Sequence, residues 1–373
     1  MDPRSPTARR FPLIARFRPA CLPLPERVHA LGELAAKAAE SHHQGLASAV
    51  YNQAALIASD TGLPGFARDL CHQHAAAYLH ACPLPAKSAI HALEPVVNLT
   101  RLRIRSGHPD DGRRGLLRLY EAVGAGTATR IEGIAVPARL TATAGDRHEI
   151  RAWLWHVLLA DGTRSLTAAG QWKEALAHLT AHHGIGNRML DGRQVAVVAA
   201  LVAGGAEQAA DLLTETTPGE PWERVVTLCL NVLTRQVASQ PTGDRLPHLV
   251  DTYLHHDSGH GMTVFDTRLG LTVLDALGPV ESPAARKVVE NLHQRTAQAN
   301  DGYAARDGLA HPTFTALATV RQIQDCESLV RACALGRRGL SAGLLDRLAA
   351  AVRLGDATIR HSLAEPAKPA PAP

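Results

Sequence analysis

The sequence predicts an all-α fold, a right-handed α-solenoid of degenerate helical hairpins, on three observations. Apolar residues recur at three- and four-residue steps through most of the chain after residue 26. Period-two alternation is rare, and Ala, the best helix former, is plentiful. Four stretches each contain an apolar helix, a glycine turn and a second apolar helix: Leu56–Leu70, Leu102–Leu119, Leu166–Leu179 and Ala199–Leu213. Because a single helical hairpin cannot bury its apolar face, we expect such units to stack.

The composition is that of a globular chain and argues against several classes of protein. Hydrophobic residues make up 46% of the 373, with no apolar run long enough to span a membrane. A net charge of +4 is too small to indicate nucleic-acid binding by itself. The six cysteines lack Cys-x-x-Cys or zinc-finger spacing and are expected to be buried, reduced thiols. Together with the lack of a signal sequence, this predicts a cytoplasmic protein that needs no cofactor.

The first element, residues 1–26, is predicted to be an irregular segment because it is rich in Pro and Arg. Its first 18 residues contain five arginines and a single acid, Asp2. One interpretation is a solvated, partly disordered start to the chain. The other is an arm that contacts nucleic acid or an anionic membrane, whose binding would be steeply salt-dependent and lost on deletion of residues 1–18.

Residues 27–238 are predicted to form the helical repeats, and residues 246–358 a further helical portion. We expect the helix that follows Pro85 to be interrupted near Pro95, because proline cannot donate to the helical ladder. Gly124–Asp146 is rich in Gly and Thr and is predicted to be a long loop or small hairpin inserted between units. Residues 359–373 form a Pro/Ala tail that is predicted to be disordered.

One of the four turns carries a family resemblance. In Ala168–Leu179, a glycine is followed by an aromatic, an acidic, an alanine and an aliphatic residue: Gly170, Trp172, Glu174, Ala175 and Leu179. This pattern resembles the central turn of a tetratricopeptide repeat. With the composition, it is similar to actinomycete tetratricopeptide-type proteins, which are free-standing or form the sensor half of helix-turn-helix regulators. The resemblance covers about Leu46 to Leu233 and implies a binding role; no helix-turn-helix precedes the repeats, because residues 1–26 are too short and too Pro-rich.

Polar side chains recur at one offset from the turn glycines. Nine or ten residues before a turn glycine stand Asn52, Asn98, Asp161 and Gln194. In a tetratricopeptide stack, the first helix of each unit lines the concave groove. A carboxamide offers both a donor and an acceptor, so such a ladder suits the backbone of an extended peptide. The alternative is that these groups tie adjacent helices together or face water.

Four further residues are candidates for ligand contacts. Arg101 and Arg105 follow Asn98 by one and two turns and would contact an acidic ligand. Tyr51 and Trp155 would add apolar contacts. Alternatively, the two arginines lie on a solvent-exposed helix face and bind no ligand.

The histidines suggest a second class of function. His178 and His182 are spaced by four residues, and His255, His256, Asp257 and His260 lie within six positions. Imidazole and carboxylate together suit zinc or iron, but no H-E-x-x-H motif is present, and a chain with 20 histidines contains clusters by chance. We therefore predict no metal. No nucleophile elbow and no phosphate-binding glycine loop is present either.

The leading hypothesis is a non-enzymatic module that binds a peptide or protein segment in a concave groove, as a regulator or adaptor. The alternative is a natural-product tailoring enzyme with its site near His255, Asp257 and His260. A nucleic-acid accessory that uses the N-terminal arginines is a third hypothesis. Whether the chain forms a homodimer is left open.

Overall fold

The computed structural model describes residues 1–256, 259–278 and 281–364 and divides the chain into two compact units. Unit 1 contains Met1–Pro23 and Gly162–Cys333, and unit 2 contains Leu24–Asp161 and Ala334–Pro373. Each unit is therefore built from two separate segments of sequence. These boundaries do not coincide with the predicted boundaries near residues 238, 246 and 358. The two units are described separately.

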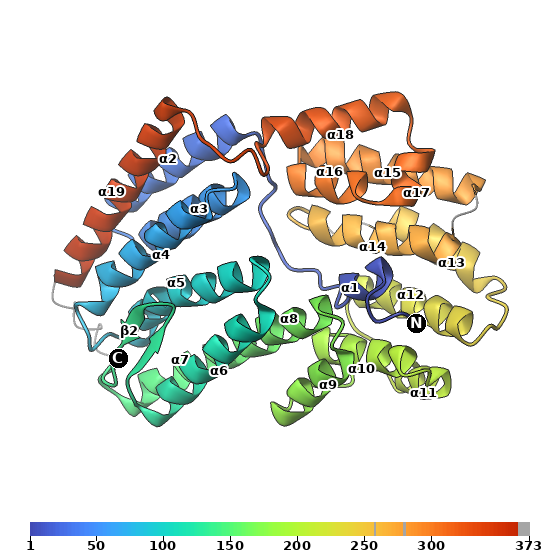
Figure 1. Ribbon diagram of the computed structural model, residues 1–373, viewed down its shortest axis with the longest axis horizontal. Helices are drawn as coiled ribbons and strands as arrows, with labels where there is room; N and C mark the ends of the chain where they lie inside the picture. Colours follow the sequence, from blue (N-terminus) through green and yellow to red (C-terminus); the bar gives the residue numbers. More distant parts are fainter. Residues whose placement is uncertain (257–258, 279–280, 365–373) are drawn as a thin grey trace, which may run out of the picture. The chain divides into compact units, whose positions relative to one another are not determined.

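Unit 2 consists of helices that pack on their neighbours in sequence, so the predicted all-α class is confirmed there. Its elements are α2 (Leu24–Glu40), α3 (Gln44–Asp60), α4 (Pro64–Leu79), α5 (Ala86–Arg105), α6 (Pro109–Ala125), β1 (Thr129–Ile131), β2 (Ile134–Val136), α7 (Ala144–Val157) and α19 (Ala342–Ala364). A π-helical turn, η1 (Leu158–Gly162), ends this run. From the far end of the sequence, α19 returns to pack on α2 and α3 (Figure 1).

Unit 1 is also helical, and most of its helices pack on the next one in sequence. Its helices are α1 (Pro6–Arg10), α8 (Thr163–Ala168), α9 (Trp172–Ala181), α10 (Asp191–Val202), α11 (Ala206–Thr214), α12 (Pro221–Val237), α13 (Arg245–His255), α14 (Thr263–Leu277), α15 (Pro283–Ala299), α16 (Gly302–Leu309), α17 (Pro312–Leu317) and α18 (Val320–Ala332). Its largest fully buried side chains include Trp172, Tyr253 and Phe314.

The predicted glycine turns are confirmed. Gly62, Gly107, Gly170 and Gly204 each lie between two helices with φ between +77° and +91°. A side chain with a Cβ rarely adopts this left-handed conformation, so glycine at these positions lets the chain reverse between helices. These turns occur in both units.

The predicted insertion in Gly124–Asp146 is a small antiparallel hairpin, in which β1 pairs with β2. Its two-residue turn places Glu132 and Gly133 at positive φ, and the carboxylate of Glu132 pairs with Arg68 on α4 at 3.1 Å. Ile131, Ile134 and Val136 are buried in the core of unit 2. The hairpin is therefore a packed part of unit 2 and not a free loop.

Two local predictions need correction. The predicted interruption at Pro95 is wrong, because α5 continues through this proline to Arg105. Proline there removes one backbone bond to the carbonyl of His91, but Pro95 is buried and packing holds the helix. At the C-terminus, α19 extends past residue 359 to Ala364, and the rest of the predicted tail lies outside the described residues.

The N-terminal segment is irregular apart from α1, as predicted, but it is not a solvated arm. Ala8, Phe11, Leu13 and Cys21 are each at most 1% exposed. Burial of such side chains contributes on the order of 2 kcal/mol each for the larger ones. Residues 1–23, which we call the N-terminal strap, are therefore an integral part of unit 1.

Candidate functional site

The predicted polar residues of unit 2 form one hydrogen-bonded row across α3, α5 and η1. Arg101 donates from Nη1 to Asn98 Oδ1 at 3.1 Å, and Asn98 donates from Nδ2 to Asn52 Oδ1 at 2.9 Å. Asn52 then donates from Nδ2 to Glu94 Oε2 at 2.7 Å. The row therefore connects helices that are far apart in sequence, and its three hydrogen bonds run in one direction, from Arg101 to Glu94.

The outer end of the row is an ion pair. Arg101 donates from Nε to Asp161 Oδ2 at 2.9 Å, and its Nη2 lies 2.7 Å from the same oxygen. The Arg101 side chain is 44% exposed, so its charge contacts water. Asp161 lies in η1, where a π-helical turn displaces the backbone from the regular α-helical path. Four of the predicted site residues, Asn52, Asn98, Arg101 and Asp161, are thus brought together.

The inner end of the row is a buried group of residues that the sequence analysis missed. Ser48 donates to Glu94 Oε2 at 3.0 Å, and its Oγ lies 2.8 Å from His74 Nε2. Because the single hydroxyl proton of Ser48 is used on Glu94, His74 is the donor to Ser48. The four-residue spacing of Ser48 with Asn52, and of Glu94 with Asn98, places each pair on one helix face and is the sequence signal that marks this group.

The inner group has two shifted pKa values. Burial lowers the pKa of His74 to about 3, so its ring is neutral near pH 7. Burial alone would raise the pKa of Glu94, but the hydrogen bond and charge of His91 and the hydrogen bond from Asn52 together hold it below its ordinary value. Glu94 is therefore a carboxylate that accepts hydrogen bonds from Ser48 and Asn52 and also contacts His91.

A Ser, His and Glu in contact have the composition of a catalytic triad, but the geometry here is not that of an activated nucleophile. A nucleophilic serine gives its proton to the histidine, whereas Ser48 receives a hydrogen bond from His74. Ser48 and His74 are also 0% and 1% exposed. The ring of Tyr51 stacks on His74 with 4.8 Å between ring centroids and closes the group from one side. This inner group contacts the inner end of the row through Glu94 and Asn52.

The amides of the row keep hydrogen-bonding capacity. Within the described residues, Asn52 and Asn98 each donate one side-chain N–H and accept, at the amide oxygen, from one side-chain donor. Each retains its second N–H, since a carboxamide has two. Both side chains are only partly buried. The row therefore presents two oriented amides and a guanidinium that are able to accept another polar partner.

The third predicted carboxamide, Gln194, lies in unit 1 and has a different environment. Its side chain is fully buried on α10. Its Oε1 accepts from the backbone N–H of Leu13 at 2.7 Å, and its Nε2 donates to the backbone carbonyl of Leu13 at 2.8 Å and to that of Met189 at 3.0 Å. Gln194 therefore binds both the N–H and the carbonyl of Leu13, which is how we expected a carboxamide to bind a peptide ligand. Here, however, the bound backbone belongs to the chain's own N-terminal strap.

Other contacts hold the strap along its length. Trp172 donates from Nε1 to the carbonyl of Pro3 at 3.0 Å, and the side chain of Arg10 pairs with Asp275 on α14. Beyond Leu13, the N–H of Arg18 donates to the carbonyl of Gly261 at 2.9 Å. The N–H of Cys21 donates to Asp301 Oδ1 at 3.2 Å. The strap therefore crosses successive helices of unit 1 from α8 to α16 (Figure 1).

The remaining predicted contact residues have mixed positions. Tyr51 is buried, and its hydroxyl donates to Asp356 on α19 at 3.0 Å, so it joins two helices of unit 2. Trp155 is partly buried, with its ring against His156 at 4.9 Å. Arg105 is exposed at the last turn of α5.

The histidine segment of the alternative hypothesis is only partly described, because Asp257 lies outside the described residues. The ring of His255 is exposed and lies 3.2 Å from Asp251, whereas the ring of His260 lies 5.9 Å from that of Phe17. In the described parts of the chain, no three His, Cys, Asp or Glu side chains are grouped as metal ligands would be. The enzyme hypothesis stays a prediction.

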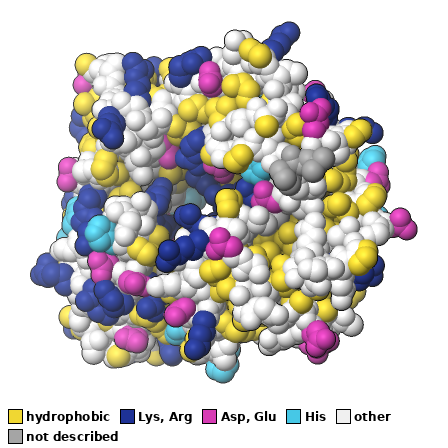
Figure 2. Space-filling model, turned by 45° about the vertical axis from the view of Figure 1, so that its right-hand side comes forward, with side chains coloured by type: hydrophobic (Ala, Val, Ile, Leu, Met, Phe, Trp, Pro, Cys, Tyr) yellow, Lys and Arg dark blue, Asp and Glu magenta, His cyan; other side chains and the backbone are white. Residues whose placement is uncertain are grey.

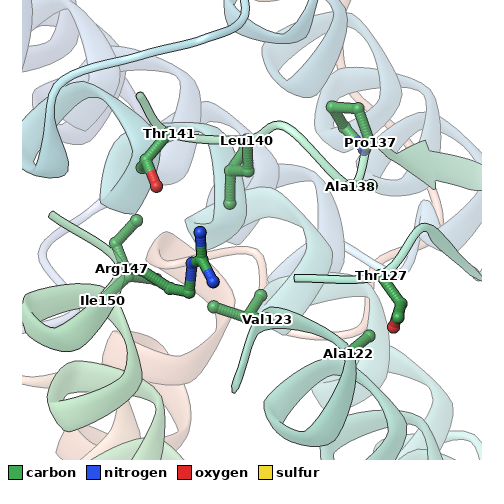
Figure 3. Close-up of a pocket in the computed structure, with 9 residues that line it drawn as sticks. All are labelled: Ala122, Val123, Thr127, Pro137, Ala138, Leu140, Thr141, Arg147 and Ile150. Atoms are coloured by element: carbon green, nitrogen blue, oxygen red, sulfur yellow. The ribbon is translucent and has the colours of Figure 1, made fainter. Parts of the chain in front are cut away.

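A small cavity in unit 2 lies between α6, the segment after β2, and α7. Val123, Leu140 and Ile150 line this cavity, and Figure 3 shows the guanidinium of Arg147 directed among them. The space open to water-sized spheres is about 10 Å³, which is room for about one water molecule. This cavity is too small to hold a ligand.

The surface gives little support to a nucleic-acid interface. On the face shown in Figure 2, Lys and Arg side chains lie with Asp and Glu side chains between them. Two of the five N-terminal arginines, Arg10 and Arg16, pair with Asp275 and Asp191. None of the helices in the described ranges combines the length and apolarity needed to cross a membrane.

Comparisons with known proteins assign neither a family nor a function to the chain. No family model matches the chain, and no curated protein and no solved structure matches it either.

Proposed function

We propose that the chain is a non-enzymatic binding module that holds an extended peptide or protein segment along the polar row of unit 2, as a regulator or adaptor. The single observation that carries the proposal is the pair of hydrogen bonds between Gln194 and the backbone of Leu13. It is direct precedent, within this chain, for a carboxamide on a repeat helix that binds an extended backbone.

Position in the sequence links the two sites. Asn52 and Gln194 both stand ten residues before a turn glycine, on α3 and α10. Gln194 uses both of its N–H groups, whereas Asn52 and Asn98 each retain one. Asn52 and Asn98 thus each retain an amide N–H of the kind that Gln194 donates to the backbone of the strap. In this proposal both units are stacks of tetratricopeptide-like hairpins, which the packing of consecutive helices supports.

The charges of the row favour a ligand that offers its neutral backbone, with an acidic residue near Arg101. The carboxylate of Glu94 is turned inward to Ser48 and Asn52, so it does not repel a ligand at the outer end. Arg101 is paired with Asp161, and an acidic ligand residue would compete for the same guanidinium. Such a ligand would gain specificity from the charge and affinity from the amides.

The test is a selection of peptides from a random library displayed on phage, with the full-length protein as bait. Enriched peptides are synthesised, and their dissociation constants are measured by fluorescence anisotropy. Substituting Asn52→Ala and Asn98→Ala together is expected to weaken binding by at least about tenfold, because two amide partners are lost. Arg101→Ala should weaken acidic peptides more than neutral ones.

Two exposed residues supply matched controls: Gln53→Ala on α3 and Arg118→Ala on α6. Both should leave binding unchanged. The proposal is wrong if no peptide is enriched, or if the doubly substituted protein retains the native circular dichroism spectrum and binds the peptides with unchanged affinity.

A further inference from the structure

Unit 1 contains a cluster of positive charge that the proposed function does not use. Arg268 on α14 and Arg306 on α16 both contact a single carboxylate, Asp307, and Arg18 on the N-terminal strap lies close enough for its charge to act on Arg268. Arg306 donates to Asp307 at 3.0 Å, and Arg268 Nε lies 3.6 Å from the other oxygen of the same carboxylate. Two guanidinium groups therefore share one carboxylate, and with the nearby charge of Arg18 the cluster has an excess of two positive charges.

The third guanidinium has no acidic partner among the described residues. The Cζ atom of Arg18 lies 4.1 Å from the centre of the Tyr303 ring, and that of Arg306 lies 5.5 Å from the same centre. Tyr303 is buried and follows Asp301, whose carboxylate accepts from the backbone N–H groups of Cys21 and Tyr303. Arg18 and Arg306 are thus fixed against one aromatic ring from two different segments of chain.

The close approach of these positive charges is electrostatically unfavourable. Burial lowers the pKa of Arg268, Asp307 opposes this shift, and the nearby charges of Arg18 and Arg306 lower it further. An arginine remains charged in proteins, so like charges are held together in a partly desolvated place. The side chain of Arg268 is nevertheless 31% exposed and that of Arg306 51% exposed, so a small anion has access to them.

We propose that Arg18, Arg268 and Arg306 form a binding site for a doubly charged oxyanion of the phosphate type, carried by a small molecule. Two negative charges match the excess of the cluster. The planar, forked donors of arginine suit the tetrahedral oxygens of a phosphate group, and such charge-assisted bonds are strong. A monoanion such as acetate would leave half of the excess uncompensated.

Because Arg18 belongs to the strap, the site is complete only while the strap is docked on unit 1. An anion held by all three guanidinium groups would therefore link the strap to α14 and α16. This linkage requires that anion binding stabilises the docked strap, since a ligand favours the state that binds it.

The test uses the full-length protein and inorganic phosphate, pyrophosphate, O-phosphoserine and acetate, each titrated by isothermal calorimetry at constant ionic strength. The phosphate-bearing anions are expected to bind and acetate to bind far more weakly. Tighter binding of pyrophosphate would identify a diphosphate as the source of the group, and tighter binding of O-phosphoserine a phosphorylated amino acid. Arg268→Gln and Arg18→Ala should each weaken phosphate by at least about tenfold.

Arg321→Ala, at an exposed arginine on α18, is the matched control and should leave phosphate binding unchanged. Arg306→Ala removes a half-exposed side chain and supplies a further variant if Arg268→Gln fails to fold. As a second readout, hydrogen exchange of residues 16–21 should slow when phosphate is added to the wild type but not to Arg268→Gln. The absence of phosphate binding, or binding to Arg18→Ala and Arg306→Ala with wild-type affinity, would overturn the proposal.

Discussion

The two units contain the same kind of polar residue nine or ten positions before a turn glycine, yet they use it differently. In unit 1, Gln194 is fully buried and every one of its hydrogen-bonding groups is occupied, two of them on the strap. In unit 2, Asn52 and Asn98 bond to each other, to Glu94 and to Arg101 and remain partly exposed. The comparison teaches that a carboxamide at this position holds the fold together where an extended segment of the same chain, here the N-terminal strap, occupies its hydrogen-bonding groups.

The largest effect is expected from Gln194→Ala in unit 1. The substitution leaves the N–H and carbonyl of Leu13 buried without partners, which costs about 3 kcal/mol in the free energy of unfolding of the strap. Hydrogen exchange of residues 11–21, measured by mass spectrometry, should accelerate accordingly. Gln208→Ala, at an exposed position on α11, is the control. Unchanged protection of the strap would show that Gln194 does not hold it.

The second effect concerns pH and unit 2. The pKa of His74 is about 3 in the folded state and near 6.5 when unfolded, so the unfolded state binds an additional proton between these values. Stability contributed by the neutral ring is present above pH 6.5 and is lost as the pH falls, by up to about 1.4 kcal/mol per pH unit. The lowered pKa of Glu94 acts in the same direction at lower pH.

His74→Gln keeps a donor for Ser48 but cannot titrate, so it should flatten this pH dependence. The measurement is urea unfolding of the full-length protein at a series of pH values below neutrality. His80→Gln, at an exposed position near the end of α4, should leave the slope unchanged. A slope that is equally steep in His74→Gln and wild type contradicts the buried, neutral state of His74.

A smaller effect is expected from Asn98→Ala in unit 2. Its amide links Asn52 to Arg101, but both neighbours keep other partners and contact water. The expected loss is about 1 kcal/mol, well below that of Gln194→Ala. Local stability measured by hydrogen exchange on α3 and α5 checks this order. A loss as large as that of Gln194→Ala would mean that the two units use their amides alike.

The smallest effect is expected from Arg16→Ala on the strap. Arg16 pairs with Asp191 at 2.9 Å, but its side chain is 56% exposed. Exposed ion pairs contribute about 0.5 kcal/mol and are weakened by salt. The strap should therefore keep its protection from exchange, which makes this variant a useful contrast with Gln194→Ala. Release of the strap by Arg16→Ala would show that its charges, and not its buried backbone bonds, hold it.

The sequence by itself determined the features that arise from neighbouring residues. Helical periodicity predicted the all-α class, positive-φ glycines such as Gly62 and Gly204 marked the turns, and the Gly- and Thr-rich stretch marked the hairpin. The offset of nine or ten residues before a turn glycine also selected Asn52, Asn98 and Asp161, which do lie in one row. These features depend on spacing along one helix or turn, and spacing is visible in a sequence.

Tertiary structure alone decided which residues from distant segments meet. Nothing local shows that Leu13 lies against Gln194, that α19 returns to α2 and α3, or that the charge of Arg18 acts on Arg268, some 250 residues along the chain. The sequence suggested a solvated strap, because Pro and Arg are typical of irregular, exposed segments. Phe11 and Leu13 are nevertheless buried, because helices of unit 1 cover them. Burial and long-range pairing are properties of the packed chain, because the surface that an extended segment covers exists only after the helices have assembled.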